Sequence, residues 1–233
     1  MNAVITGASR GIGKAIAEIF ATHGYNLYLC SKNEKNLLQT IDALKKDFPA
    51  VHIDGRAMDV GKKAGARLFA EWVLNNTDAI DVLVNNVGTY IPGNVSDEED
   101  GVLEQMLEVN LYSAYYTTRA LLPQIKKRGS GHIFTICSIA SLDAYPGGGA
   151  YSISKYALLG FTRNLREELK SSGIKVTAVI PGAVYTDSWN GSGVSQNRIM
   201  EAADIAQMIY AASRLSPQAV VEDIVLRPQL GDL

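Results

Sequence analysis

A tyrosine and a lysine four residues apart, Tyr151 and Lys155, stand in a stretch that repeats apolar residues at helical spacing. Residues four apart lie one turn apart on one face of a helix, with Cβ atoms roughly 5–6 Å from each other. A free tyrosine has a pKa of about 10 and exchanges protons poorly at neutral pH, and a nearby ammonium lowers that pKa. The pair is therefore a candidate acid/base, although such pairs alone are common on exposed helices.

Two further polar residues stand where a side chain could face a substrate. Ser138 follows the apolar run 133–137, which predicts a buried strand that would hold the serine hydroxyl at its end, ready to bind a substrate oxygen. Asn110 lies between two helical stretches, where an inward-facing amide must find hydrogen-bond partners. The structural alternatives are a turn cap for Ser138 and a helix kink or cap for Asn110.

A glycine-rich turn, TGASRGIG at residues 6–13, directly follows the apolar run 2–5 and precedes a helical pattern over 14–23. Glycines at positions 7, 11 and 13 permit positive φ and a close approach of the backbone. The N-terminus of the following helix offers unpaired N–H groups and partial positive charge to a pyrophosphate. Because this turn joins a strand to a helix, it predicts dinucleotide binding rather than a merely structural turn.

The elements that must position these residues alternate between short strands and longer helices along the whole chain. Near-continuous apolar runs predict seven strands, at residues 2–5, 26–30, 52–58, 82–85, 132–137, 175–180 and 223–226, and stretches such as 36–48 and 151–170 have helical spacing. This alternation indicates an α/β fold, a doubly wound parallel seven-stranded sheet with helices on both faces, Rossmann-like. We expect a single domain over residues 1–233, with a mobile loop at 186–197.

Composition limits the classes of partner. The 233 residues carry a formal net charge of −2 and are 47 % hydrophobic, so they offer no broad positive field for a phosphate backbone, and a small-molecule substrate fits better than nucleic acid. Cys30 and Cys137 fall in apolar runs and are expected to be reduced packing residues. The sequence shows no signal-type start and no apolar run of roughly 18 residues. It predicts a cytoplasmic protein with no membrane span and no metal site.

The motifs, taken in order, are similar to those of the short-chain dehydrogenase/reductase family over nearly the whole chain. The glycine spacing is TGxxxGxG rather than GxGxxG, and the other matching motifs are Asp59-Val60, Asn85-Asn86-Val87-Gly88, Asn110, Ser138, Tyr151-x-x-x-Lys155 and the stretch 181–186. Each falls at the C-terminal end of an expected strand or at the start of a helix, the edge where open α/β sheets bind ligands. The family usually has alanine where this chain has Val87.

This resemblance implies a catalytic tetrad. Tyr151 would protonate or deprotonate the substrate oxygen, and Ser138 would polarise it. Lys155 would lower the pKa of Tyr151 and hold the nicotinamide ribose, while Asn110 would anchor a water for proton relay. The residues implied for cofactor binding are Tyr151 and Lys155 together with Gly7, Ser9, Arg10, Gly11, Ile12, Gly13, Ser31, Lys32, Asp59, Val60, Asn86, Val87, Gly88, Pro181, Gly182, Val184 and Thr186.

The end of the second expected strand bears on the choice of cofactor. In dinucleotide folds an acid at this place binds the adenosine ribose and repels a 2′-phosphate. Here the strand ends with Ser31 and Lys32, and Arg10 in the glycine turn could approach a 2′-phosphate from the other side. The expected cofactor is therefore NADP(H), and the alternative is that Lys32 and Arg10 are solvated surface cations.

The expected activity is reduction of a small carbonyl by NADPH. The stretches 181–189 and 220–232 resemble bacterial sepiapterin reductase-like members of the family. In that case Asp232 would hold the aminopyrimidinone edge of a pterin ketone and Trp189 would stack on its ring. The alternative for these two residues is structural: Trp189 would cover the core, and Asp232 would belong to a frayed tail. The alternatives for the activity are reduction of a diketone and reduction of a 3-oxoacyl group on an acyl-carrier protein.

Other classes explain the sequence less well. A non-catalytic NADP-sensing protein on the same fold would be free to lose the tetrad, and this chain keeps all four residues. A nucleotide-sugar epimerase would need a longer C-terminal substrate domain, and a methyltransferase has no use for the tyrosine, lysine and serine together. Family members pair the helices expected here at 110–127 and 151–170, so we expect a homodimer or homotetramer.

Overall fold

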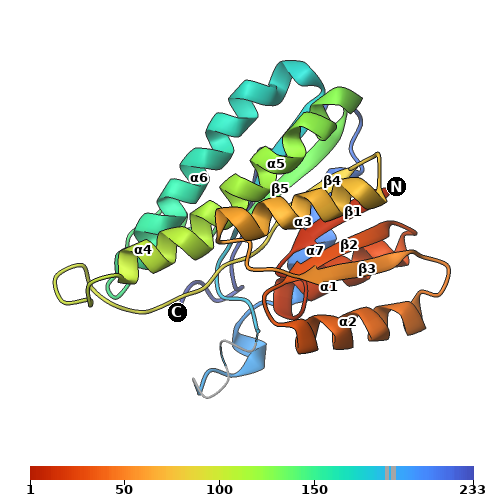
Figure 1. The fold of residues 1–233 in the computed structure, drawn as a ribbon. Helices are drawn as coiled ribbons and strands as arrows, with labels where there is room; N and C mark the ends of the chain where they lie inside the picture. Colours follow the sequence, from red (N-terminus) through yellow and green to blue (C-terminus); the bar gives the residue numbers. More distant parts are fainter. Residues whose placement is uncertain (187–188, 190–192) are drawn as a thin grey trace.

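The chain forms one seven-stranded parallel sheet in a computed structural model that describes residues 1–233 except 187–188 and 190–192 (Figure 1). The strand order is β3-β2-β1-β4-β5-β6-β7. The order reverses between β1 and β4, and adjacent loops diverge at such a switch point to leave a crevice for a ligand. The strands are β1 (Asn2–Thr6), β2 (Asn26–Ser31), β3 (Ile53–Ala57), β4 (Val82–Asn85), β5 (Gly131–Ile136), β6 (Ile174–Pro181) and β7 (Asp223–Leu226).

Helices cover both faces of the sheet. The apolar residues of α1 (Gly11–Thr22), α2 (Glu34–Asp47) and α7 (Ala202–Ser213) pack into one core. Those of α3 (Lys63–Asn76), α5 (Ser113–Arg128) and α6 (Gly149–Leu169) pack into another. A short helix, α4 (Val102–Met106), and a π-helical turn, η1 (Leu107–Tyr112), lead into α5. The predicted doubly wound, Rossmann-like fold is confirmed.

The central strands are largely apolar because they are buried on both faces, whereas the edge strands β3 and β7 carry exposed residues. In β1, Ala3 and Ile5 belong to the core beneath α1, whereas Val4 between them belongs to the core beneath α3, and all three have no exposed surface. Helices on both sides remove the need for the polar alternation of a half-exposed strand. Cys30 and Cys137 are buried and unpaired.

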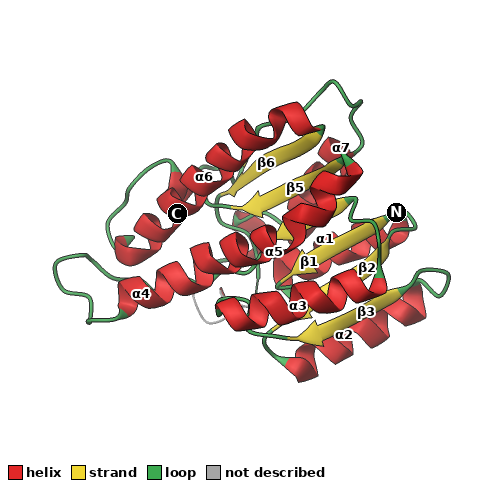
Figure 2. Cartoon of the chain, turned by 45° about the horizontal axis from the view of Figure 1, so that its top comes forward, coloured by secondary structure: helices red, strands yellow, loops and turns green. Residues whose placement is uncertain are grey.

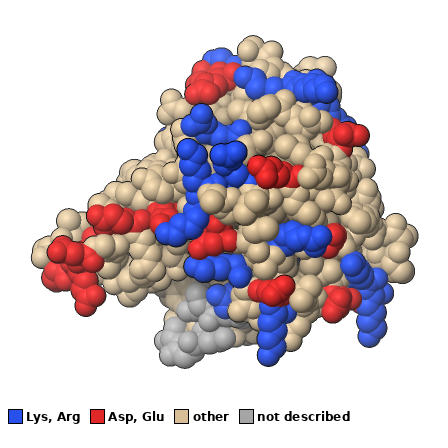
Figure 3. All heavy atoms as spheres, viewed as in Figure 1, with Lys and Arg blue, Asp and Glu red and all other residues tan. Residues whose placement is uncertain are grey.

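The candidate site residues lie at the carboxyl edge of this sheet. The arrowheads of the parallel strands point to the same side of the molecule in Figure 2, where the loops after β1, β4, β5 and β6 gather. On the face that Figure 3 shows, basic and acidic groups are interspersed, and acidic groups gather at the protruding end beside α4.

Two further observations concern the described part of the chain. No helix there is long and apolar enough to cross a membrane. Nor do the described residues bring three His, Cys, Asp or Glu side chains close enough together to hold a metal ion.

Candidate active site

The turn after β1 has no room for side chains at its three glycines, Gly7, Gly11 and Gly13. Gly7 and Gly11 have φ of +66° and +54°, a region that L side chains rarely adopt. A Cβ on Gly13 would lie 2.3 Å from the Gly7 carbonyl oxygen and 2.4 Å from Nδ2 of Asn86. That amide donates to the carbonyls of Thr6 and Gly7 at 3.1 and 3.0 Å and so fastens the segment after β4 to the turn. The three glycines therefore create a bare backbone surface at the switch point.

The N-terminus of α1 opens onto this surface. The helix, described throughout, begins at Gly11, carries no acidic residue in its first turn, and has an N-cap, Arg10, that makes no capping side-chain hydrogen bond. A Cβ on Gly11 would lie 3.1 Å from Cγ2 of Thr186, so the segment after β6 closes over the turn. First-turn N–H groups facing a bare glycine surface fit a pyrophosphate. The glycine turn thus fits the phosphates of a nucleotide cofactor.

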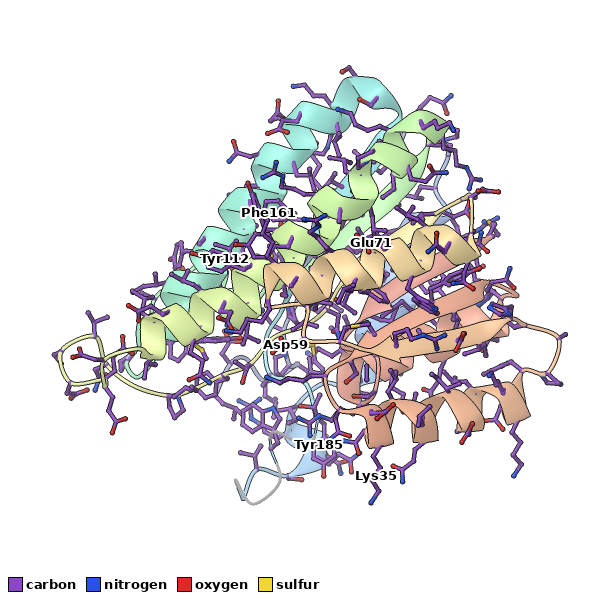
Figure 4. The ribbon with its side chains drawn as sticks, in the orientation of Figure 1. Lys35, Asp59, Glu71, Tyr112, Phe161 and Tyr185 are labelled. Carbon is purple, nitrogen blue, oxygen red and sulfur yellow. The ribbon has the colours of Figure 1, made fainter. Side chains whose placement is uncertain are left out.

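The ends of β2 and β3 form the corner next to this turn. The hydroxyls of Ser9 and Ser31 share a hydrogen bond of 2.8 Å. Nζ of Lys32 lies 2.8 Å from Oδ2 of Asp59, and the lysine side chain is 80 % exposed. Its hydrogen bond to Asp59 raises the pKa of Lys32. Figure 4 shows Asp59 at the same edge of the sheet as Tyr185, and Val60 beside it is buried.

Asn110 sits in the π-helical turn η1 and has no exposed surface. Its Oδ1 accepts from the Thr89 N–H at 2.7 Å, and its Nδ2 donates to the Thr89 carbonyl at 3.0 Å and to Oγ of Ser154 at 2.9 Å. A Cβ on Gly88 would lie 3.4 Å from this Oδ1 and 3.5 Å from Nζ of Lys155. Asn110 therefore joins the loop after β4 to the helix that carries Tyr151 and Lys155.

Lys155 is buried, and its Nζ donates to the Ile136 carbonyl at 2.9 Å. Burial lowers the pKa of Lys155 to about 8. The ammonium lies 5.9 Å from the centre of the Tyr151 ring. The helix α6 thus brings the predicted pair together on one face, with the amine deep in the site.

Ser138 follows β5 and begins a short 3-10 turn, η2 (Ile139–Ser141). Its Oγ accepts from the Ala140 N–H at 3.1 Å, so the turn-capping alternative is correct. Burial raises the pKa of Tyr151, and the Ser138 hydroxyl opposes that rise. The expected effect of the Lys155 ammonium on this pKa stays a prediction.

The segment after β6 is tied at both ends. Pro181 pairs with Leu226 of β7, and the Gly182 N–H donates to the Leu226 carbonyl at 2.8 Å. Val184 is buried and forms a parallel bridge with Met200. These contacts fix the backbone expected to hold the nicotinamide carboxamide, whereas the predicted mobile loop 186–197 includes 187–188 and 190–192, which lie outside the described residues.

The two candidate substrate residues are not brought together by any contact among the described residues. Trp189 is half-buried, and its backbone N–H donates to the Thr186 carbonyl at 3.0 Å. The tail does fold back, since Arg198 donates to the carbonyls of Gly231 and Asp232 at 2.9 and 3.0 Å. The Asp232 carboxylate, however, forms an ion pair with Arg227. A role in holding a pterin stays a prediction, and it requires that pair to open.

Sequence reasoning missed several residues that position the site. Glu98 lies in the loop after β4, and its carboxylate accepts from the Ala150 N–H at 3.1 Å. It therefore caps the first turn of α6, which contains Tyr151. Tyr90 packs edge-on against the ring of Tyr151 with centres 4.9 Å apart. Both contacts join the loop after β4 to the helix α6, more than 50 residues further along the chain, and no periodic pattern signals them.

These features define a class of protein. A glycine-rich turn at the switch point of a parallel sheet, next to a buried lysine with a tyrosine ring 5.9 Å away, is typical of a nucleotide-dependent oxidoreductase. The sequence profile described as short chain dehydrogenase matches residues 1–196. The chain belongs to the short-chain dehydrogenase/reductase family and is an oxidoreductase.

Curated relatives are similar along most of the chain. An uncharacterized oxidoreductase of Staphylococcus saprophyticus is 30 % identical over 226 residues, 97 % of this chain and 96 % of that protein. A Streptomyces virginiae protein named as a ketoacyl reductase of the monensin polyketide synthase is 35 % identical over 186 residues, 79 % of this chain and 70 % of its own length.

Solved structures show the same fold. The alcohol dehydrogenase of the archaeon Thermococcus sibiricus, in complex with 5-hydroxy-NADP, has a TM-score of 0.89 and 30 % identity and covers 98 % of this chain and 96 % of its own. The L-sorbose reductase of Gluconobacter frateurii, in complex with NADPH and L-sorbose, has a TM-score of 0.89 and 26 % identity, with 97 % and 94 % covered.

Proposed function

We propose that this protein is an NADPH-dependent reductase of small carbonyl compounds. The observation that carries the proposal is the pair on α6, where Nζ of the buried Lys155 lies 5.9 Å from the centre of the Tyr151 ring. A phenol keeps its proton at neutral pH and can give it to a carbonyl oxygen, and a nearby ammonium favours the phenolate that remains.

The corner at the end of β2 supports NADPH over NADH. An acid that would repel a 2′-phosphate is missing from the sequence there, where Ser31 and Lys32 stand instead. Lys32 is mostly exposed, and its ammonium can turn from Asp59 toward a phosphate because an exposed ion pair is worth little. The alcohol dehydrogenase and the L-sorbose reductase with this fold were solved with a phosphorylated form of the cofactor.

The reaction divides between the cofactor and the chain. When bound, the nicotinamide nucleotide supplies the hydride that adds to the carbonyl carbon. Tyr151 gives its proton to the carbonyl oxygen, so that an alcohol and the oxidised nucleotide result, and Ser138 orients that oxygen. Lys155 holds a positive charge near the phenol below a pH of about 8, and a charge there favours the phenolate that remains after the transfer. By family resemblance, Asn110 anchors the water that returns a proton.

The substrate is proposed as a small ketone or diketone. A pterin ketone of the sepiapterin kind is a narrower version of this proposal, and it needs Asp232 to leave its ion pair with Arg227. A β-keto thioester is the other version, and the similarity to a ketoacyl reductase of Streptomyces virginiae supports it.

A screen of NADPH consumption tests the proposal. The purified protein would be given pterins, diketones, acetoacetyl thioesters and sugars, each with NADPH and with NADH, while the fall of absorbance is followed. We expect turnover of at least one carbonyl class with a preference for NADPH. Tight NADPH binding without turnover of any carbonyl would instead identify a cofactor-sensing protein.

A further inference from the structure

Two tyrosines outside the tetrad stand next to Tyr151. The ring of Tyr90, in the loop after β4, meets the Tyr151 ring edge-on, with centres 4.9 Å apart and planes at 80°. Tyr145, in the loop before α6, lies close enough to Tyr90 and Tyr151 for both to raise the pKa of its phenol, after the larger effect of burial. Tyr90 and Tyr145 keep 49 % and 40 % of their surface exposed. They therefore present aromatic surface to solvent beside the proton donor.

The two loops that carry these tyrosines are fastened together. The Gly93 N–H donates to the Gly147 carbonyl at 3.1 Å, and the Gly147 N–H donates to Oδ1 of Asn94 at 3.0 Å. A Cβ on Gly148 would lie 3.2 Å from Cε1 of Tyr145, so this ring packs over bare backbone. Both loops reach the end of the molecule beside α4 in Figures 1 and 2. The tyrosines thus belong to one assembled wall.

The chemistry of this wall is aromatic. Tyrosine rings prefer edge-on or offset contact with another flat π-system, and each such contact is worth about two- to tenfold in affinity beyond area burial. Exposed rings beside a reactive group are typical of a binding surface, since pockets are lined mainly by apolar and aromatic side chains with a few polar groups. The only polar side-chain atoms that Tyr90 and Tyr145 add to the wall are their hydroxyl oxygens. A flat, unsaturated substrate fits such a wall better than a polyol does.

We propose that Tyr90 and Tyr145 form a specificity-determining wall, and that the preferred substrate carries its carbonyl next to an aromatic or conjugated ring. This inference rests on the proposed carbonyl reduction and names its substrate class. The reacting carbonyl would lie against Tyr151 and Ser138, and the ring would lie against the exposed face of the wall. Asp232 and Trp189 take no part in this arrangement.

The test compares two diketones that differ only in the ring: 1-phenyl-1,2-propanedione and 1-cyclohexyl-1,2-propanedione. The ratio of their kcat/KM values with NADPH is measured for the natural protein, Tyr90→Leu, Tyr145→Leu and the double variant. Comparing ratios between proteins cancels the different intrinsic reactivities of the diketones. We expect each single substitution to lower the phenyl-to-cyclohexyl ratio about two- to tenfold, while kcat/KM for the cyclohexyl compound changes less.

Controls separate specificity from damage. Tyr210→Leu, on α7 across the sheet, removes a tyrosine whose ring also contacts other rings, those of Phe20 and His23, and should leave the ratio unchanged. NADPH affinity, measured by fluorescence, should be the same in all variants. An equal loss for both diketones, or an unchanged ratio in Tyr90→Leu and Tyr145→Leu, would show that the tyrosines only cover the tetrad and would overturn the inference.

A binding measurement keeps the wall testable apart from catalysis. If neither diketone is turned over, carbonyl reduction is in doubt, but the wall still predicts binding. Acetophenone and cyclohexyl methyl ketone would then be titrated calorimetrically into the NADPH complex of the natural protein and of Tyr90→Leu. A preference for acetophenone that Tyr90→Leu abolishes supports the wall, and equal affinities in the two proteins rule it out.

Discussion

At the scale of single residues, Tyr151 determines whether the site can do chemistry. Tyr151→Phe removes the phenol hydroxyl while the ring keeps its edge-on contact with Tyr90. We expect turnover to fall by roughly 10²–10⁴, the usual contribution of general acid/base catalysis, with NADPH affinity nearly unchanged. Steady-state kinetics on the best carbonyl substrate, with a fluorescence titration of NADPH as the control, measures both. Near-normal turnover in Tyr151→Phe would refute the acid role of this tyrosine.

Lys155 shows a conflict between function and stability. Its folded pKa of about 8 lies below the ordinary 10.5, so below pH 8 the buried ammonium destabilises the fold, and this penalty disappears as pH rises from about 8 to 10.5. Lys155→Met should therefore raise the free energy of unfolding at pH 7 by about 1–3 kcal/mol and abolish activity. Denaturant unfolding at pH 7 and pH 10 measures the free energy of unfolding of both proteins. If Lys155→Met stabilised the protein as much at pH 10 as at pH 7, the buried ammonium would not be the cause.

Lys32 decides the proposed cofactor preference. Lys32→Asp places a second carboxylate beside Asp59, where Nζ of Lys32 now lies 2.8 Å from Oδ2, and should repel a 2′-phosphate. NADPH affinity should fall about tenfold or more, since a lost charge-assisted contact is worth about 1.5–3 kcal/mol, while NADH affinity changes less. The matched control is Lys46→Asp, the same charge change at the other end of α2, roughly 18 Å along the helix. Equal effects of the two substitutions would make Lys32 a surface cation.

At the scale of elements, β5 contains a histidine that makes folding sensitive to acid. Nε2 of His132 lies 2.7 Å from Oγ1 of Thr177 on β6, and the imidazole stacks on Phe134 with ring centres 3.9 Å apart. Burial lowers the pKa of His132 to about 3. The unfolded histidine gains a proton near pH 6.5, so the stability due to this group is lost as pH falls from 6.5 toward 3.

The acid sensitivity can be measured on a variant. Between pH 7 and pH 5 His132 should remove about 2 kcal/mol of stability. His132→Gln keeps a polar group for Thr177 but does not titrate, so the drop in unfolding free energy between these pH values should shrink by about that amount. His23→Gln, at an exposed position on the end of α1, should leave the drop unchanged. A drop in His132→Gln as large as in the natural protein would contradict the assignment.

The strands were predictable because burial on both faces leaves a plain signal. Each predicted strand overlaps an observed one, and most boundaries differ by one residue, as in β6, which extends from Ile174–Pro181 against the expected 175–180. The tetrad and the glycine turn were predictable because their motifs are short and follow strands. Their proximity follows from the parallel topology, which places all strand ends at one edge.

The rest of the site depends on contacts between distant loops. The environment of Asn110 requires a π-helical turn and the backbone of Thr89, 21 residues away, and helical periodicity does not distinguish such a turn from an α-helix. The sequence likewise did not predict that Tyr90 and Tyr145 lie beside Tyr151. These two tyrosines come together only because their loops are joined through Gly93 and Gly147. Local patterns carry no information about such pairings.

At the scale of the whole molecule, η1 and α6 expose more apolar surface than a helix layer on one sheet requires. Tyr112, Ile153 and Tyr156 are 39 %, 41 % and 44 % exposed. Figure 4 labels Tyr112 and Phe161 along this pair of helices, and the ring of Phe161 packs against Tyr115 with centres 5.7 Å apart. Exposed apolar groups on neighbouring helices are typical of an interface between copies.

We therefore expect the protein to form a homodimer or homotetramer through α5 and α6. Light scattering at micromolar concentration should give two or four times the mass of 25.1 kDa. Ile153→Lys places a charge on the exposed face of α6, where burying it against a second copy is unfavourable, and should shift the mass toward that of a monomer. Leu38→Lys, at a 50 % exposed position on α2 on the other face of the sheet, should not. A clean monomer mass for the natural protein would refute this assembly, and an unchanged oligomer in Ile153→Lys would place the interface elsewhere.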